Sequence, residues 1–77
     1  MITQKQYQEF MEHLMWQRLQ SPDYRMGQAF LNYFPNISTE MTRDGDHGTL
    51  FEMKLYYETD EERAKWLINQ WVTPLDQ

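Results

Sequence analysis

The sequence predicts a mainly α, compact domain of three helices, with a short extended segment or β-hairpin inserted between the second and the third helix. Two capping boxes, a Ser-Pro helix start and three stretches of apolar residues at helical spacing support this fold class. The alternative is an α+β fold, in which the insert forms a sheet. We expect one small domain, residues 1–77, because a chain of 77 residues with 40% hydrophobic content suffices for a single core.

The first helix is predicted to begin at Thr3, because Thr3 and Gln6 have the spacing of a capping box. Ile2 precedes this start and is expected to pack against Tyr7. Apolar residues then recur at intervals of three and four, which is typical of a helix with one face towards the core. Trp16 points away from that face, among charged residues. The predicted core face consists of Tyr7, Phe10, Met11, Leu14 and Met15, with Leu19 at its margin.

The segment 21–34 is predicted to be the central helix. Ser21 and Pro22 are typical of a helix start, and Pro35 prevents the helix from continuing. More than half of its circumference is apolar, so this helix must contact neighbours on two sides. Gly27 costs about 1 kcal/mol relative to alanine within a helix, which indicates close approach of another backbone, either that of the first or of the last helix. A ligand beside the glycine is the alternative.

Residues 36–49 form a polar insert whose turn is expected at Asp44-Gly45. The following segment, 50–58, alternates apolar and polar residues with a period of two, and 37–43 alternates more weakly. These patterns predict a β-hairpin across the Asp-Gly turn. The alternative is an irregular loop with one short extended piece at 55–57.

The last helix is predicted to begin at Thr59, with Glu62 completing a capping box, and to end at Thr73-Pro74. The acidic residues of its first turn interact favourably with the helix dipole. Trp66 falls on the polar side of this helix, as Trp16 does on the first. The inward face consists of Ala64, Leu67, Ile68, Trp71 and Val72.

The charge balance disfavours several classes of function. A net charge of −5, from 7 basic and 12 acidic residues, opposes direct binding to a nucleic-acid backbone. The absence of cysteine rules out disulfides and thiolate chemistry and is typical of a reducing compartment. No segment has the apolar length of a signal peptide core or a membrane span. We therefore expect a cytoplasmic protein without membrane contact.

The residues that could carry chemistry are few and poorly spaced. Asp44, Asp46 and His47 share the polar turn, but they lack the spacing of a calcium-binding loop and the further nitrogen or sulfur ligands of a zinc site. Nucleophilic catalysis needs a base beside a nucleophile, and the chain offers two serines and two histidines without such a pattern. We expect no metal, no cofactor and no enzymatic activity.

The two outward tryptophans predict a binding surface, since exposed tryptophan is enriched among interface hot spots. Function is therefore predicted as a small non-enzymatic interaction protein that binds another protein, with self-association as a further possibility. Small-ligand binding, such as sequestration of a nucleotide signal by an oligomer, is the alternative. The predicted partner-binding residues are Trp16, Trp66, Glu58, Asp60, Glu61 and Glu62, and the alternative ligand-binding residues are Arg25, Arg43, Lys54, Tyr56 and Tyr57.

Two ten-residue stretches, Arg25–Phe34 and Leu55–Ala64, resemble small uncharacterised proteins of tailed bacteriophages. Those proteins share an Arg-x-Gly-Gln-Ala-x-x-Asn helix and a later Tyr-x-x-x-Asp that leads into a last helix; the insert after Asn36 is longer here. The resemblance implies a viral accessory protein that acts in the host cytoplasm by binding a host component, including defence machinery. A minor virion or assembly component is a second alternative. The resemblance to the phage proteins implies no particular site residues.

Overall fold

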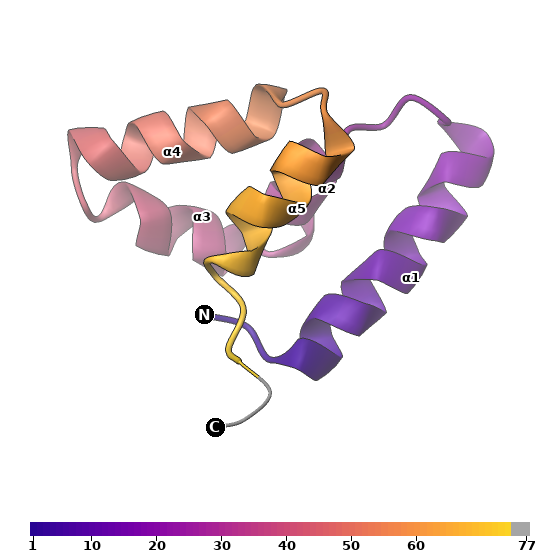
Figure 1. The fold of residues 1–77 in the computed structure, drawn as a ribbon, viewed down its shortest axis with the longest axis horizontal. Coiled ribbons are helices and arrows are strands. Elements are labelled where there is room, and N and C mark those ends of the chain that lie inside the picture. Colours follow the sequence, from indigo (N-terminus) through magenta and orange to yellow (C-terminus); the bar gives the residue numbers. More distant parts are fainter. Residues whose placement is uncertain (75–77) are drawn as a thin grey trace.

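The computed structural model of the protein describes residues 1–74 and is mainly helical, which confirms the broad fold class. Within these residues there are five helices and no β-strand, so the predictions of a three-helix domain and of a hairpin insert are wrong. Figure 1 shows α1 on one side, the α3–α4 pair on the other, and α2 and α5 between them. The helices are α1 (Gln4–Gln20), α2 (Met26–Tyr33), α3 (Pro35–Thr42), α4 (Asp46–Tyr57) and α5 (Glu61–Asn69).

The helix α2 is the central element, as predicted, because it contacts each of the other four helices. Its predicted start at Ser21 is wrong: Arg25 precedes the first helical residue, and the backbone N–H of Tyr24 donates to the Ser21 carbonyl at 3.0 Å. Serine followed by proline also suits the first two positions of a β-turn, which is the role they have here. Four apolar side chains of α2 are buried in the core: Met26, Ala29, Phe30 and Leu31.

The insert forms a helical hairpin instead of a β-hairpin. Its apolar residues also recur at helical spacing, and this second pattern decides the fold: Ile37 and Met41 are buried on α3, and Leu55 is buried on α4. A strand would place Met53 on the same face as Phe51 and Leu55, but the structure exposes Met53. The predicted turn is confirmed at Gly45, whose φ of 70° is readily adopted by glycine.

Two glycines allow these helices to approach one another closely. A Cβ atom at Gly27 would lie 1.9 Å from the carbonyl oxygen of Leu55, and one at Gly48 would lie 1.6 Å from that of Met41. The predicted backbone approach at Gly27 is therefore confirmed, but the neighbour is α4, not the first or the last helix. In both contacts one helix backbone lies directly against another, and the space between them leaves no room for a side chain.

The helix α1 begins with the predicted capping box, since the Thr3 hydroxyl and the Gln6 side chain each accept from the other residue's backbone N–H. Phe10 is fully buried and its ring lies 5.4 Å from that of Phe30. In the C-terminal half of the predicted core face Leu14 is buried, as predicted, but its neighbours are exposed. Met15 follows the buried Leu14 and therefore lies about 100° around the helix from it, at the edge of the face that packs on the rest of the domain. The exposed members of that face are Met15 and Leu19.

The helix α5 is capped by Asp60, whose carboxylate accepts from the backbone N–H groups of Glu62 and Arg63 at 3.0 and 3.4 Å. The predicted start at Thr59 is therefore wrong by one residue. The predicted end at Thr73-Pro74 is also wrong, because the helix ends at Asn69. Beyond α5, Val72 pairs with Ile2 in an isolated parallel bridge that joins the two ends of the described chain. The predicted inward face is confirmed, with Ala64, Leu67, Ile68 and Val72 buried and Trp71 partly buried.

Tyr7 gives the fold a testable pH dependence. Burial raises the pKa of its hydroxyl above the ordinary 10.0, and the negative charge of Glu61 raises it further. The folded protein keeps this proton at pH values where the unfolded chain has lost it, so the stabilisation is complete below about pH 10 and declines as the pH rises further. The thermal midpoint should fall as the pH rises above about 10, and less steeply in Tyr7→Phe. An equal fall in Tyr7→Phe would contradict this, and Tyr57→Phe, at an exposed tyrosine, is the control.

Candidate functional site

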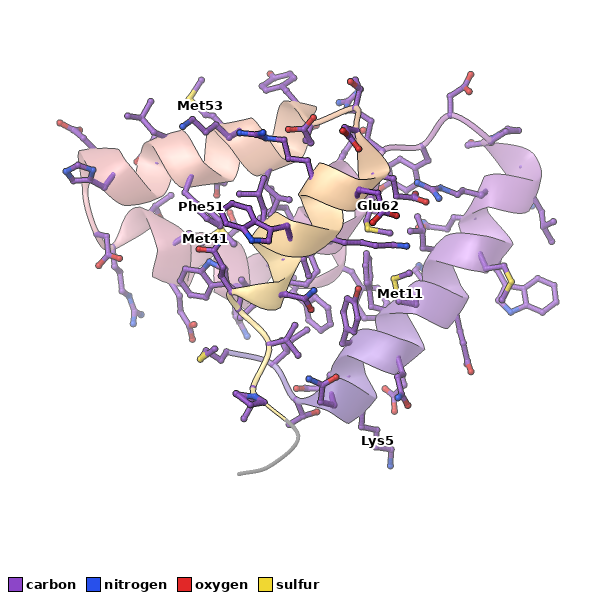
Figure 2. All side chains as sticks on the ribbon, in the orientation of Figure 1. Lys5, Met11, Met41, Phe51, Met53 and Glu62 are labelled. Carbon is purple, nitrogen blue, oxygen red and sulfur yellow. The ribbon has the colours of Figure 1, made fainter. Side chains whose placement is uncertain are left out.

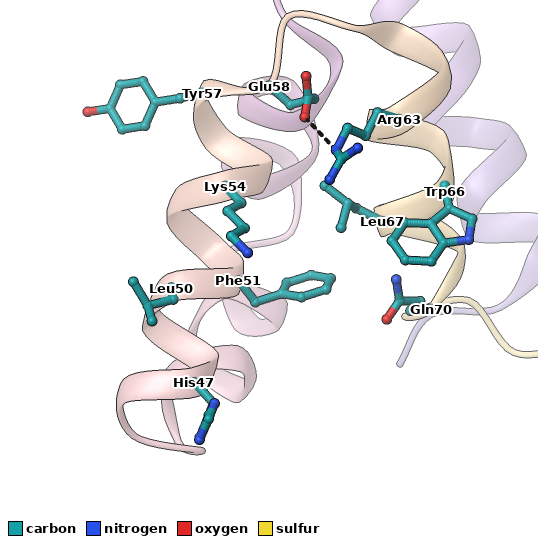
Figure 3. Close-up of a pocket in the computed structure, with 10 residues that line it drawn as sticks. All are labelled: His47, Leu50, Phe51, Lys54, Tyr57, Glu58, Arg63, Trp66, Leu67 and Gln70. Atoms are coloured by element: carbon teal, nitrogen blue, oxygen red, sulfur yellow. Dashed lines mark ion pairs between the residues drawn. The ribbon is translucent and has the colours of Figure 1, made fainter.

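A groove runs between α4 and α5 and has a volume of about 660 Å³. Figure 3 shows its two walls: Phe51 and Lys54 of α4 and Arg63 and Leu67 of α5 are directed towards the space between the helices, whereas Leu50 and Tyr57 project away from it. We call it the Trp66 groove. The α4 side contributes His47, Leu50, Phe51, Lys54, Tyr57 and Glu58, and the α5 side contributes Arg63, Trp66, Leu67 and Gln70.

The walls follow directly from helical spacing. The α4 residues recur at i, i+3, i+4 and i+7, and the same spacing holds on the other wall for three residues of α5 and its C-cap, Gln70: the two sets are His47, Leu50, Phe51 and Lys54, and Arg63, Trp66, Leu67 and Gln70. Each helix therefore presents one continuous stripe to the groove. An ion pair of 3.3 Å between Arg63 Nε and Glu58 Oε2 closes the end nearest the α4–α5 connection.

The floor of the groove is apolar. Leu67 is buried, and the partly buried ring of Phe51 lies 6.4 Å from that of Trp71 beneath it. Trp66 is 64% exposed, and Leu50 and Tyr57 are exposed as well. Large apolar side chains in such number beside a concave floor are typical of a surface that another molecule covers.

Trp16 and Trp66 both face outward, as predicted, but they do not belong to one surface. Trp16 lies on α1, is 70% exposed and takes no part in the Trp66 groove. The sequence places both indoles opposite a core stripe, yet it does not show how their helices are oriented relative to each other.

The acidic residues predicted as a docking patch are dispersed over several structural roles. Glu58 pairs with Arg63 and lines the groove, and Asp60 caps α5. Glu61 forms an ion pair with Arg18 of α1, and Glu62 lies 3.9 Å from the ammonium of Lys65. Only Glu58 of this set lines the Trp66 groove.

The residues of the small-ligand alternative are only partly brought together. The guanidinium of Arg25 lies 5.6 and 5.8 Å from the ring centroids of Tyr56 and Tyr57, and its Nε donates to the Tyr56 carbonyl at 3.0 Å. These contacts tie the start of α2 to the last turn of α4. Lys54 lines the Trp66 groove, whereas Arg43, which follows the last residue of α3, is not among the residues that line it.

The sequence pattern predicts Lys54, Tyr57 and Glu58 of the α4 wall as site residues, but it does not predict Leu50 and Phe51, because the segment is interpreted as a strand. The signal that could have found Leu50 and Phe51 is the i, i+3, i+4, i+7 spacing shared with Lys54. Read as a helix, the segment places these three on one side, together with His47.

Chemically, the Trp66 groove offers apolar contact area with a few charged groups. Among residues 1–74, no three histidine, aspartate or glutamate side chains gather as metal ligands.

None of the helices described in this part of the chain has both the length and the apolar character needed to span a bilayer. Comparison with models of protein families, with curated proteins and with solved structures found no match to this chain.

Proposed function

We propose that the protein is a non-enzymatic interaction protein that binds a segment of another protein in the Trp66 groove. The observation that carries this proposal is Trp66 itself, which is 64% exposed at the edge of a concave apolar floor. Tryptophan is enriched among interface hot spots, which lie in well-packed pockets that become desolvated on binding. In line with the resemblance to small phage proteins, the proposed partner is a protein of the host cell.

The charges of the groove indicate what the partner segment carries. Lys54 forms no ion pair or hydrogen bond with another residue in 1–74, although the chain as a whole has a net charge of −5. Its side chain extends from α4 towards the groove (Figure 3). A bound segment with apolar anchors and at least one carboxylate would cover the apolar floor and pair with this ammonium.

Affinity capture from a bacterial lysate with variants of the immobilised protein tests the proposal. Trp66→Ala should lose the partner, because truncating a hot-spot tryptophan costs about 2 kcal/mol or more, a weakening of about thirtyfold. Lys54→Glu should also weaken capture, because it places a carboxylate opposite the partner's own. Both positions are exposed, so circular dichroism should stay unchanged.

Trp16→Ala is the matched control, since it makes the same substitution at the other strongly exposed tryptophan. The protein lost by Trp66→Ala should remain bound to Trp16→Ala. Retention of every captured protein by Trp66→Ala would contradict the proposal.

The nucleotide-binding alternative has less support, because Arg25 and Tyr56 already bond to each other within the fold. A thermal-shift screen separates the two proposals. A nucleotide at a hundredfold over its Kd would add about 2.7 kcal/mol to the free energy of unfolding. We expect no shift with any nucleotide.

A further inference from the structure

A second groove lies along α1, on a different surface, and has a volume of about 530 Å³. We call it the methionine groove. Met11 lies on the side of α1 that faces the rest of the domain (Figure 2). The apolar lining comes from Met11, Leu14, Met15 and Leu19 of α1 and from Met26 of α2, and the charged lining from Glu12, Arg18 and Glu61.

The exposed wall of this groove is apolar, although no part of the described chain covers it. Met15 is 61% and Leu19 is 70% exposed, and neither is covered by another helix. Met11, Met15 and Leu19 are spaced by four residues each, so they form a ridge of about 12 Å along two turns of α1. That length matches the i, i+3, i+4, i+7 anchors of one amphipathic helix laid into the groove.

The charge of the groove selects the kind of helix. Arg18 is already neutralised, because it forms an ion pair with Glu61 and its Nε donates to the Tyr24 carbonyl at 3.1 Å. Glu12 is exposed and forms no ion pair with a residue in 1–74, which leaves the groove with a net negative rim. A cationic partner is therefore a better electrostatic match for this groove than a second copy of this chain, which carries a net charge of −5.

We infer that the methionine groove binds a cationic amphipathic helix of a partner protein, with apolar residues on one face and lysine or arginine beside them. Methionine is flexible and polarisable, so a wall built from Met11, Met15 and Met26 adapts to apolar side chains of different shape. The protein would then have two binding surfaces of opposite charge preference. This inference does not depend on the proposed function of the Trp66 groove.

The test uses two 14-residue peptides with leucine at i, i+3, i+4 and i+7. One carries lysine at the other positions and the second carries glutamate, and binding is followed by fluorescence anisotropy of the labelled peptide. The lysine peptide should bind, and the glutamate peptide should not. Met15→Gln and Leu19→Gln should each weaken binding about tenfold, and Glu12→Gln about threefold with a reduced salt dependence.

Matched controls separate groove binding from attraction to an acidic protein. Met53→Gln removes an exposed methionine that projects from α4 (Figure 2), and Glu9→Gln removes an exposed carboxylate outside the groove; both should bind like wild type. Trp66→Ala should also bind the peptide normally. Equal binding of the two peptides, or equal effects of Met15→Gln and Met53→Gln, would overturn the inference. So would a dimer in sedimentation that Met15→Gln dissociates, because the groove would then be covered by a second copy.

Discussion

Gly27→Ala is expected to destabilise the domain by about 3 kcal/mol, at the upper end of overpacking effects. The added Cβ would lie 1.9 Å from the carbonyl oxygen of Leu55, so α2 and α4 must separate, and no rotamer change can relieve a contact with backbone. The loss would lower the thermal midpoint by roughly 12–24 °C in a domain of this size. Helix propensity alone predicts the opposite, a gain of about 1 kcal/mol.

Thermal unfolding followed by circular dichroism measures this effect. Gln8→Ala, at an exposed interior position of α1, is the control for placing alanine in a helix and should change stability by less than about 0.5 kcal/mol. A stabilised Gly27→Ala would show that α2 and α4 do not pack backbone to backbone.

Gly48→Ala is the second substitution with a large expected effect, of about 2–3 kcal/mol. Its Cβ would lie 1.6 Å from the carbonyl oxygen of Met41, which forces α3 and α4 apart beside their shared turn. The neighbouring Thr49 is exposed on the same helix, so Thr49→Ala should leave stability unchanged or slightly increased. Chemical denaturation of the two variants compares them directly, and equal midpoints would contradict the helical hairpin.

The parts of the fold that the sequence predicts correctly depend on contiguous residues. The capping box of Thr3 and Gln6, the buried face of α5 and the close approach at Gly27 all follow from local spacing or local cost. The central position of α2 follows for the same reason, since its broad apolar surface needs several neighbours.

The α3–α4 hairpin could not be predicted in this way, because Phe51 and Leu55 fit both a period of two and a helical period. The choice depends on tertiary contact: as a helix, the segment brings Gly48 against α3 and buries Leu55 beneath α2. The Asp-Gly turn does not decide between them, because it is compatible with a β-hairpin and with a helical hairpin. Similarly, the exposure of Met15 beside the buried Leu14 depends on how wide a face of α1 its neighbours cover, which the pattern of α1 does not contain.

For the candidate site, the sequence predicts the outward tryptophans but not the surfaces that they belong to. The outward position of Trp66 follows from the helical spacing of α5 alone, because Trp66 lies opposite the buried stripe whichever helix packs against that stripe. Its groove needs the α4 wall, and Leu50 and Phe51 join it only once that segment is helical.

The measurement that tests the Trp66 groove most directly is the NMR spectrum of the tryptophan indole N–H groups during titration with a captured partner or its binding segment. The indole resonance of Trp66 should shift or broaden in proportion to the bound fraction, while that of Trp16, on α1, stays in place. A partner that binds while the Trp66 resonance remains unchanged would contradict the claim that this groove is the protein's binding site.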